Sequence, residues 1–133
     1  MDEVTVHVEA EVNPTEAEEK VRTAVANIFG NITICIKSST KGSILVAETK
    51  GIEALAKLRN LLRMDRVRDA ARRVFFGSLH GKTVSFCLNK QVAFAGHISF
   101  SEEVAESPLG PLKVIIESEN PRQLIDWLAP RTT

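Results

Sequence analysis

The feature that most constrains the fold is the spacing of apolar residues, which changes along the chain from every second residue to every third or fourth. At residues 4–12, valine or alanine alternates with polar residues, and this period of two is typical of a strand covered on one face. The same alternation returns at 32–36 and 43–48, which are joined by a turn-like segment at 38–42. The sequence therefore predicts one strand followed later by a β-hairpin.

Helical spacing separates these strands. Asn13 is followed by proline and, three residues later, by glutamate, an order typical of a helix start, so we expect a first helix from there to Gly30. After Gly51 the apolar residues are spaced by three and four. Two stripes lie out of phase across Met64 and Asp65, and Asp65 can cap a following helix. This region is therefore predicted to form two short helices.

The last third of the chain returns to the strand period. Residues 84–88 and 92–100 alternate, which predicts an antiparallel pair with a tight turn at Asn89 and Lys90. Residues 112–117 are predicted to form a final strand. A last helix is expected from Asn120, a capping residue followed by proline, to Pro130, which ends it. The two prolines in 106–111 indicate an irregular loop that acts as a structural corner.

The resulting order, β-α-β-β-α-α-β-β-β-α, predicts an α+β fold of two layers, in which helices pack on one face of a mainly antiparallel sheet. The chain of 133 residues is expected to form a single domain, 1–133. No apolar run approaches the roughly 18 residues that cross a bilayer, and the acidic start lacks the order of a signal peptide. We therefore expect a soluble, cytoplasmic protein without a membrane partner.

Charge is strongly segregated although the formal net charge is zero. The first nineteen residues hold seven acidic residues and no lysine or arginine, whereas 50–82 holds nine basic residues against three acidic ones. The sharpest feature is the basic segment on the two predicted helices, with Lys57, Arg59, Arg63, Arg66, Arg68, Arg72 and Arg73. Such a concentration of arginine is typical of a surface that binds phosphates.

Two interpretations of this segment remain open. Residues four apart on a helix share a face, so pairs of guanidinium groups can contact successive phosphates. The pairs are Arg59 with Arg63 and Arg68 with Arg72. The alternative is a solvated face on which carboxylates neutralise the arginines. The spacing allows this for Asp65 with Arg68 and for Asp69 with Arg73.

The uncovered face of the predicted sheet offers a second candidate surface. The alternation places only small or polar residues there, namely Thr33, Cys35, Ser85, Cys87, Ala93, Ala95, His97 and Ser99. Phe86, Phe94 and Phe100 are expected on the core side, which disfavours base stacking on this face. RNA contact would then run through phosphates, 2′-hydroxyl groups and helical shape, with weak base specificity. The alternatives for this face are a second subunit or a wet surface.

Catalytic and metal-binding patterns are weak. His97 with Glu102, Glu103 and Glu106 forms one polar cluster, but its spacing does not enforce convergence, so we predict neither an enzyme nor a metal or other cofactor. An enzyme built on this loop stays a third option. The two cysteines, Cys35 and Cys87, do not indicate a metal site or a network of disulfides either. Two half-buried thiols are expected, and a bridge between facing strands is the alternative.

Several segments carry a family resemblance. The most specific are Phe86 to Gly96, Glu106 to Pro111 and Trp127 to Thr132. Residues 12–16, 26–29 and 69–72 add to them. Together they resemble an archaeal family of small proteins, uncharacterised protein family 0201, over nearly the whole chain. One departure is Val92, where alanine is expected.

The resemblance implies a two-layer α+β fold like that of the large-subunit ribosomal protein L-five. It also implies an RNA-binding protein that is an accessory of the archaeal exosome, an RNA-processing complex, and it transfers no catalytic residue. We therefore expect a non-enzymatic protein that binds structured RNA through Lys57 to Arg73, with Lys90 at a hairpin turn as a further contact. The alternative is a protein-interaction module or homodimer joined through the open sheet face.

Overall fold

The computed structural model describes residues 4–14, 17–30, 32–39, 42–101 and 110–131. Their elements follow in this order: β1 (Val4–Val12), α1 (Glu18–Phe29), β2 (Ile34–Ser39), β3 (Gly42–Lys50), the 3-10 helix η1 (Ile52–Leu55), α2 (Ala56–Met64), α3 (Arg68–Gly77), β4 (Thr83–Asn89), α4 (Lys90–Phe94), β5 (Phe100–Ser101), β6 (Pro111–Ser118) and α5 (Pro121–Leu128).

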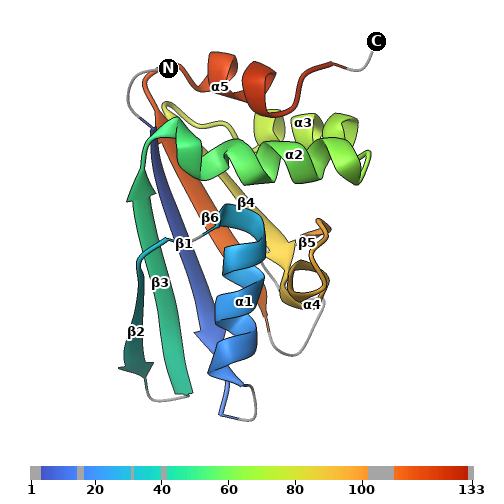
Figure 1. Ribbon diagram of the computed structural model, residues 1–133. Helices are drawn as coiled ribbons and strands as arrows, with labels where there is room; N and C mark the ends of the chain where they lie inside the picture. The colour runs from blue at the N-terminus through green and yellow to red at the C-terminus, as the bar shows by residue number, and fades with distance from the viewer. Residues whose placement is uncertain (1–3, 15–16, 31, 40–41, 102–109, 132–133) are drawn as a thin grey trace.

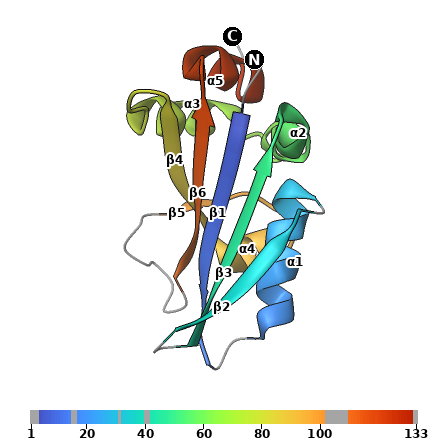
Figure 2. The ribbon, with the colours of Figure 1, turned by 90° about the vertical axis from the view of Figure 1, so that its left-hand side faces the viewer.

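The strands form one six-stranded sheet in the order β2-β3-β1-β6-β4-β5, and every neighbouring pair is antiparallel. The helices lie on one side of this sheet, with α1 and α4 along one half and α2 and α3 across the other (Figure 1). Figure 2 looks onto the opposite face, where the strands lie in front of α1 and α4. The predicted α+β fold with helices on one face is therefore confirmed. No helix in the described ranges is long and apolar enough to cross a membrane.

The core lies between the sheet and the helices, as strand alternation predicts. Every second residue of β1 from Val4 to Val12 is buried, and the alternate residues of β6 are buried in the same way. Three aromatic rings pack together behind the sheet, with centroid distances of 4.9 Å between Phe75 and Phe86 and 5.8 Å between Phe75 and Phe100. Burial of these apolar faces, which is the main stabilising term, fixes the register of the sheet.

Several predictions of local structure are confirmed. The hairpin is β2 paired with β3, and the two-helix interpretation holds because α2 ends at Met64 and α3 begins at Arg68. Asn120 caps α5 by accepting a hydrogen bond from the backbone N–H of Gln123 at 3.2 Å. Gly30 ends α1 with a φ of 77°, which is the left-handed region where glycine is favoured.

The prediction of a strand over 92–100 is wrong. Asn89 is not in a tight turn, because its side chain accepts a hydrogen bond from the N–H of Val92 at 3.1 Å and so caps α4. Only β5 of that segment is a strand. A five-residue helix buries Ala93 and leaves Phe94 43% exposed, so Phe94 is not in the core as expected. Short apolar runs do not distinguish a strand from a helix, and here the cap decides.

Two predicted helix caps are also wrong. The first helix begins at Glu18, and its N-cap residue Ala17 makes no side-chain bond, so Asn13 does not start it. Within α1, Arg22 forms an ion pair with Glu18 at 3.2 Å, one turn earlier. Asp65 is the C-terminal cap residue of α2 rather than the N-cap of α3.

The open face of the sheet differs from the prediction in its membership. Strand pairing places Cys35, Val46, Glu9, Lys113 and Cys87 in one row across β2, β3, β1, β6 and β4. Four strand spacings of about 4.8 Å separate the two cysteines by roughly 19 Å, which is too far for a disulfide. Both cysteines are thiols rather than disulfide-bonded; Cys87 is half-buried as expected, whereas Cys35 is exposed.

Ser85 lies on the open face as expected, beside Ile115 of β6, and Thr33 directly precedes β2. The remaining residues expected on this face lie elsewhere. Ala93 is buried in α4, and Ala95, His97 and Ser99 belong to the connection between α4 and β5. The proline-containing loop at 106–111 lies mostly outside the described residues, so the corner predicted there stays a prediction.

Candidate nucleic-acid interface

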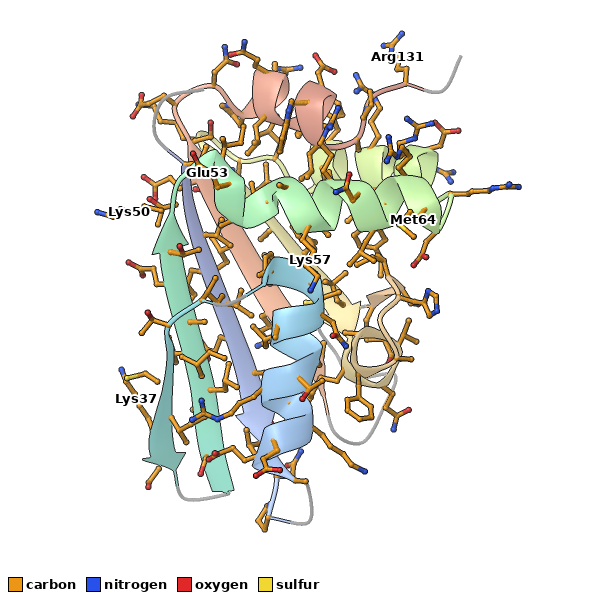
Figure 3. All side chains as sticks on the ribbon, viewed as in Figure 1. Lys37, Lys50, Glu53, Lys57, Met64 and Arg131 are labelled. Carbon is orange, nitrogen blue, oxygen red and sulfur yellow. The ribbon has the colours of Figure 1, made fainter. Side chains whose placement is uncertain are left out.

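Lys57, the first of the predicted phosphate-binding residues, joins α2 to α1. Leu58 and Leu62 are completely buried, which directs the other side chains of α2 outward or sideways. The Nζ of Lys57 donates a hydrogen bond to the carbonyl oxygen of Ala26 at 3.0 Å, in the last turn of α1. Figure 3 shows Lys57 pointing from α2 toward α1. A cation there stabilises the negative end of the α1 dipole.

Arg59 and Arg72 have the same role at the end of α5. The Nε of Arg59 donates to the carbonyl oxygen of Trp127 at 2.9 Å, and its guanidinium lies 5.1 Å from the centre of the indole ring. Arg72 forms an ion pair with Asp126 at 2.7 Å and donates to the carbonyl oxygen of Ala129 at 3.3 Å. The two arginines therefore join α2 and α3 to α5.

Lys90 does not lie at an exposed turn. It is the first residue of α4, its side chain is only 5% exposed, and its Nζ donates to the carbonyl oxygen of Glu11 on β1 at 2.6 Å. The predicted hairpin turn at Lys90 is therefore wrong, because the residue is buried and ties α4 to the sheet, while its contact with RNA stays a prediction.

The other four arginines of the basic segment, Arg63, Arg66, Arg68 and Arg73, form no ion pair with a carboxylate of the described residues. The neutralising pair of Asp65 with Arg68 does not form. Asp65 instead accepts a hydrogen bond from the backbone N–H of Ile98 at 2.7 Å and lies 3.1 Å from the Nδ1 of His97. The Asp65 carboxylate therefore contacts the segment before β5 instead of Arg68.

A small hollow lies where the basic residues of α2 and α3 meet the end of α5. Its volume is about 20 Å³, and it is lined by Arg59, Asn60, Arg63, Arg68, Leu128 and Pro130. We call it the arginine hollow. Arg59 and Arg63, four residues apart on α2, both line it, so they share one face of the helix, while their contact with successive phosphates stays a prediction. Arg68 joins them from α3, whereas Arg72 does not line the hollow.

Arg66 and Arg73 lie outside the hollow. Arg66 is in the turn between α2 and α3 with a φ of 57°, the left-handed region, and its side chain is exposed. Arg73 is five residues after Arg68 on α3, so the two side chains point about 140° apart around the helix axis. We use the name arginine surface for Arg59, Arg63, Arg66 and Arg68.

The sequence did not indicate the remaining residues of the hollow. Asn60 has a polar side chain without charge, and Leu128 and Pro130 were interpreted only as the end of the last helix. Their place beside α2 and α3 depends on tertiary packing of α5, for which no spacing rule exists. The nearest signal was the proline that ends α5.

The histidine cluster considered for catalysis is only partly described. His97 is 65% exposed and contacts Asp65, whereas Glu102, Glu103 and Glu106 lie outside the described residues. Within the described part of the chain, no group of three histidine, cysteine or acidic residues is arranged to hold a metal ion.

The open sheet face carries charges of both signs. Its rows include four glutamates and three lysines, namely Glu9, Glu11, Glu48, Glu117, Lys37, Lys50 and Lys113. His7 lies among them, 3.7 Å from Glu9 and 3.5 Å from Glu48. This mixture gives no concentrated positive potential, so the arginine surface is the better match for a polyanion.

Comparison with known proteins also points to RNA as a partner. A family model described as RNA binding matches residues 5–117. A UPF0201 protein of Sulfurisphaera tokodaii is 45% identical over 125 residues, which cover 94% of this chain and 86% of that protein. A UPF0201 protein of Sulfolobus acidocaldarius is 42% identical over 127 residues, covering 96% of this chain and 88% of that one.

A solved structure agrees with the fold. The crystal structure of a UPF0201 protein from Methanococcus jannaschii superposes with a TM-score of 0.86 at 30% identity, covering 97% of this chain and 95% of that chain. The family resemblance noted in the sequence is thereby confirmed over nearly the full length. This chain belongs to the UPF0201 family of archaeal proteins and matches a family model described as RNA binding.

Proposed function

We propose that the protein is a non-enzymatic RNA-binding protein that contacts phosphates of structured RNA through the arginine surface. The observation that carries this proposal is the convergence of Arg59, Arg63 and Arg68 on one hollow. Arg63 and Arg68 make no ion pair with a described carboxylate, so their guanidinium groups are available to bidentate phosphate contacts. The family description as RNA binding supports the same partner.

Weak base specificity is supported by the place of the three aromatic rings that cluster against the sheet. Phe75, Phe86 and Phe100 pack against one another in the core, so they offer no exposed platform for stacked bases. Phosphate contacts position a protein on RNA without reading its sequence. We therefore expect similar affinities for hairpins of equal length and unrelated sequence.

The direct test is charge reversal at the arginine surface. Arg63→Glu with Arg68→Glu removes two charge-assisted contacts of about 1.5 kcal/mol each, so the Kd for an RNA hairpin should rise about 100-fold. The matched control is Lys37→Glu with Lys50→Glu, which makes the same change of charge on the β2 and β3 side, away from the end of α2 that Met64 marks (Figure 3). The control should stay within about threefold of the unmodified protein.

Salt dependence gives an independent measure. If the surface contacts about three phosphates, affinity should fall with a log–log slope near −2.7, or about 40-fold between roughly 50 and 200 mM salt. Each Arg→Gln change at Arg63, Arg66 or Arg68 should make this slope about 1 unit shallower. Equal binding by the charge-reversed variant and its control would refute the proposal.

The resemblance to this family extends the proposal to an RNA-processing complex such as the archaeal exosome. A protein that holds RNA without cleaving it fits the role of an accessory subunit. Co-sedimentation of the protein with a purified archaeal exosome, with and without RNA, tests this part separately. If the protein does not co-sediment, its association with the exosome is refuted, and the proposal that it binds RNA is unaffected.

A homodimer through the open sheet face has less support. Ile115 is the large apolar side chain most exposed on that face, at 43%, and it lies in a row between His7 and Ser85. The centres of stable dimer interfaces are apolar, whereas this row is mixed. The sedimentation velocity of the protein without RNA measures whether the face pairs two copies.

A further inference from the structure

The arginine hollow is a small concave site rather than a long groove. Its volume of about 20 Å³ admits one or two oxygen atoms of a ligand whose remainder lies outside the hollow, whereas a ribose or a base does not fit. An internal phosphodiester carries a sugar on both sides, which limits how far its oxygens reach into such a hollow. A phosphate at the end of a strand carries three oxygens on its free side.

We propose that the arginine hollow binds a phosphate monoester, the terminal phosphate of an RNA strand, in preference to an internal phosphodiester. This inference rests on the proposed RNA-binding function and specifies which RNA group the site selects. A terminal phosphate has a charge between about −1.5 and −2 at neutral pH, whereas a diester has a charge of −1.

One donor at the hollow, Arg59, is held in advance by the fold. Arg59 uses its Nε–H on the carbonyl oxygen of Trp127 and stacks on the indole ring, which leaves its terminal Nη groups to contact a ligand. Arg63 and Asn60 come from the same helix, and Arg68 approaches from α3. A guanidinium that is already fixed loses little entropy when it binds an anion.

Helix dipoles add to this charge. Arg68 is the first residue of the ten-residue helix α3, and its N-cap residue Val67 supplies no side-chain acceptor, so the positive end of the dipole adjoins the hollow. The negative end of α5 also lies near, at Leu128, but Arg59 and Arg72 bind its last carbonyls. Asp126 is paired with Arg72 at 2.7 Å. The hollow therefore keeps a net positive charge.

The expected preference follows from Coulomb's law. One additional negative charge at about 5 Å from a net charge of about +2 gains somewhat over 1 kcal/mol even in a high dielectric, which corresponds to about tenfold in affinity. A dianion is favoured by charge and by its three free oxygens together.

The test compares one RNA hairpin prepared with a 5′-phosphate, with a 3′-phosphate and with hydroxyl groups at both ends. We expect at least one phosphorylated form to bind about tenfold more tightly than the hydroxyl form, by fluorescence anisotropy. Arg63→Gln with Arg68→Gln should reduce this ratio to below about twofold. Arg73→Gln, on the same helix but pointing away from the hollow, should preserve it.

The outcomes separate this inference from the proposed function. Equal and salt-sensitive binding of all three hairpins would overturn the preference for an end and leave RNA binding intact. Binding of none would refute the RNA-binding proposal itself. Adenosine monophosphate serves as the probe for a free nucleotide, and a nucleotide affinity equal to that of the phosphorylated hairpin would overturn the assignment to RNA. Thermal unfolding of each variant checks that the fold is kept.

Discussion

Replacing Arg72 with glutamine should weaken the fold rather than RNA binding. The ion pair with Asp126 contributes about 0.5 kcal/mol, because that carboxylate is 61% exposed. The hydrogen bond to the carbonyl oxygen of Ala129 contributes about 1 kcal/mol, and the guanidinium 4.9 Å from the centre of the Phe76 ring about 0.5 kcal/mol. The expected loss is about 2 kcal/mol. For 133 residues, with an unfolding entropy of about 2.1 cal/mol/K per residue, this lowers Tm by about 7 °C.

The assay is thermal unfolding followed by far-UV circular dichroism. Arg73→Gln is the matched control, since Arg73 is exposed on the same helix and makes no ion pair with a described carboxylate. It should change the free energy of unfolding by less than about 0.5 kcal/mol. Equal Tm values for the two variants would refute the structural role of Arg72. A hairpin Kd that rises tenfold for Arg72→Gln while Tm is unchanged would instead return Arg72 to the RNA-binding residues.

Three further changes test other contacts. Lys90→Met should lower the free energy of unfolding by about 2 kcal/mol in urea titrations, because it removes the hydrogen bond from the buried ammonium group of Lys90 to the carbonyl oxygen of Glu11 on β1. Asp65→Ala should cost about 1.5 kcal/mol and speed hydrogen exchange at the amide of Ile98, which loses its acceptor. Arg66→Gly should raise Tm slightly, by relief of about 0.5 kcal/mol of left-handed strain, and make the salt slope of RNA binding shallower by about 1 unit.

Strand periodicity predicted most of the fold because a one-residue error in register would turn every side chain of a half-buried strand outward. This constraint is strong in β1, where alternation runs from Val4 to Val12, and in β6. It is weak at 92–100, where β5 is only two residues long and α4 is a single short turn of helix. There the hydrogen bond from the backbone N–H of Val92 to the side chain of Asn89 caps a helix, and the alternation of apolar residues carries no information about such a cap.

The candidate site was only half predictable for a different reason. Spacing of four residues correctly placed Arg59 and Arg63 on one face of α2. The same spacing did not indicate that Lys57 and Arg72 donate hydrogen bonds to backbone carbonyl groups at the ends of α1 and α5. Those carbonyl groups belong to distant parts of the chain. Under the proposed function, the number of phosphates that the segment contacts is therefore expected to be about three, fewer than its seven basic residues.

The stacking of Arg59 on Trp127 gives the protein a natural optical signal. Trp127 is the only tryptophan, and the chain contains no tyrosine, so its emission reports on one place alone. Its partner guanidinium also lines the arginine hollow. An anion that draws Arg59 toward itself alters the electric field on the indole ring and shifts its emission, so occupancy of the hollow can be titrated without attaching a dye.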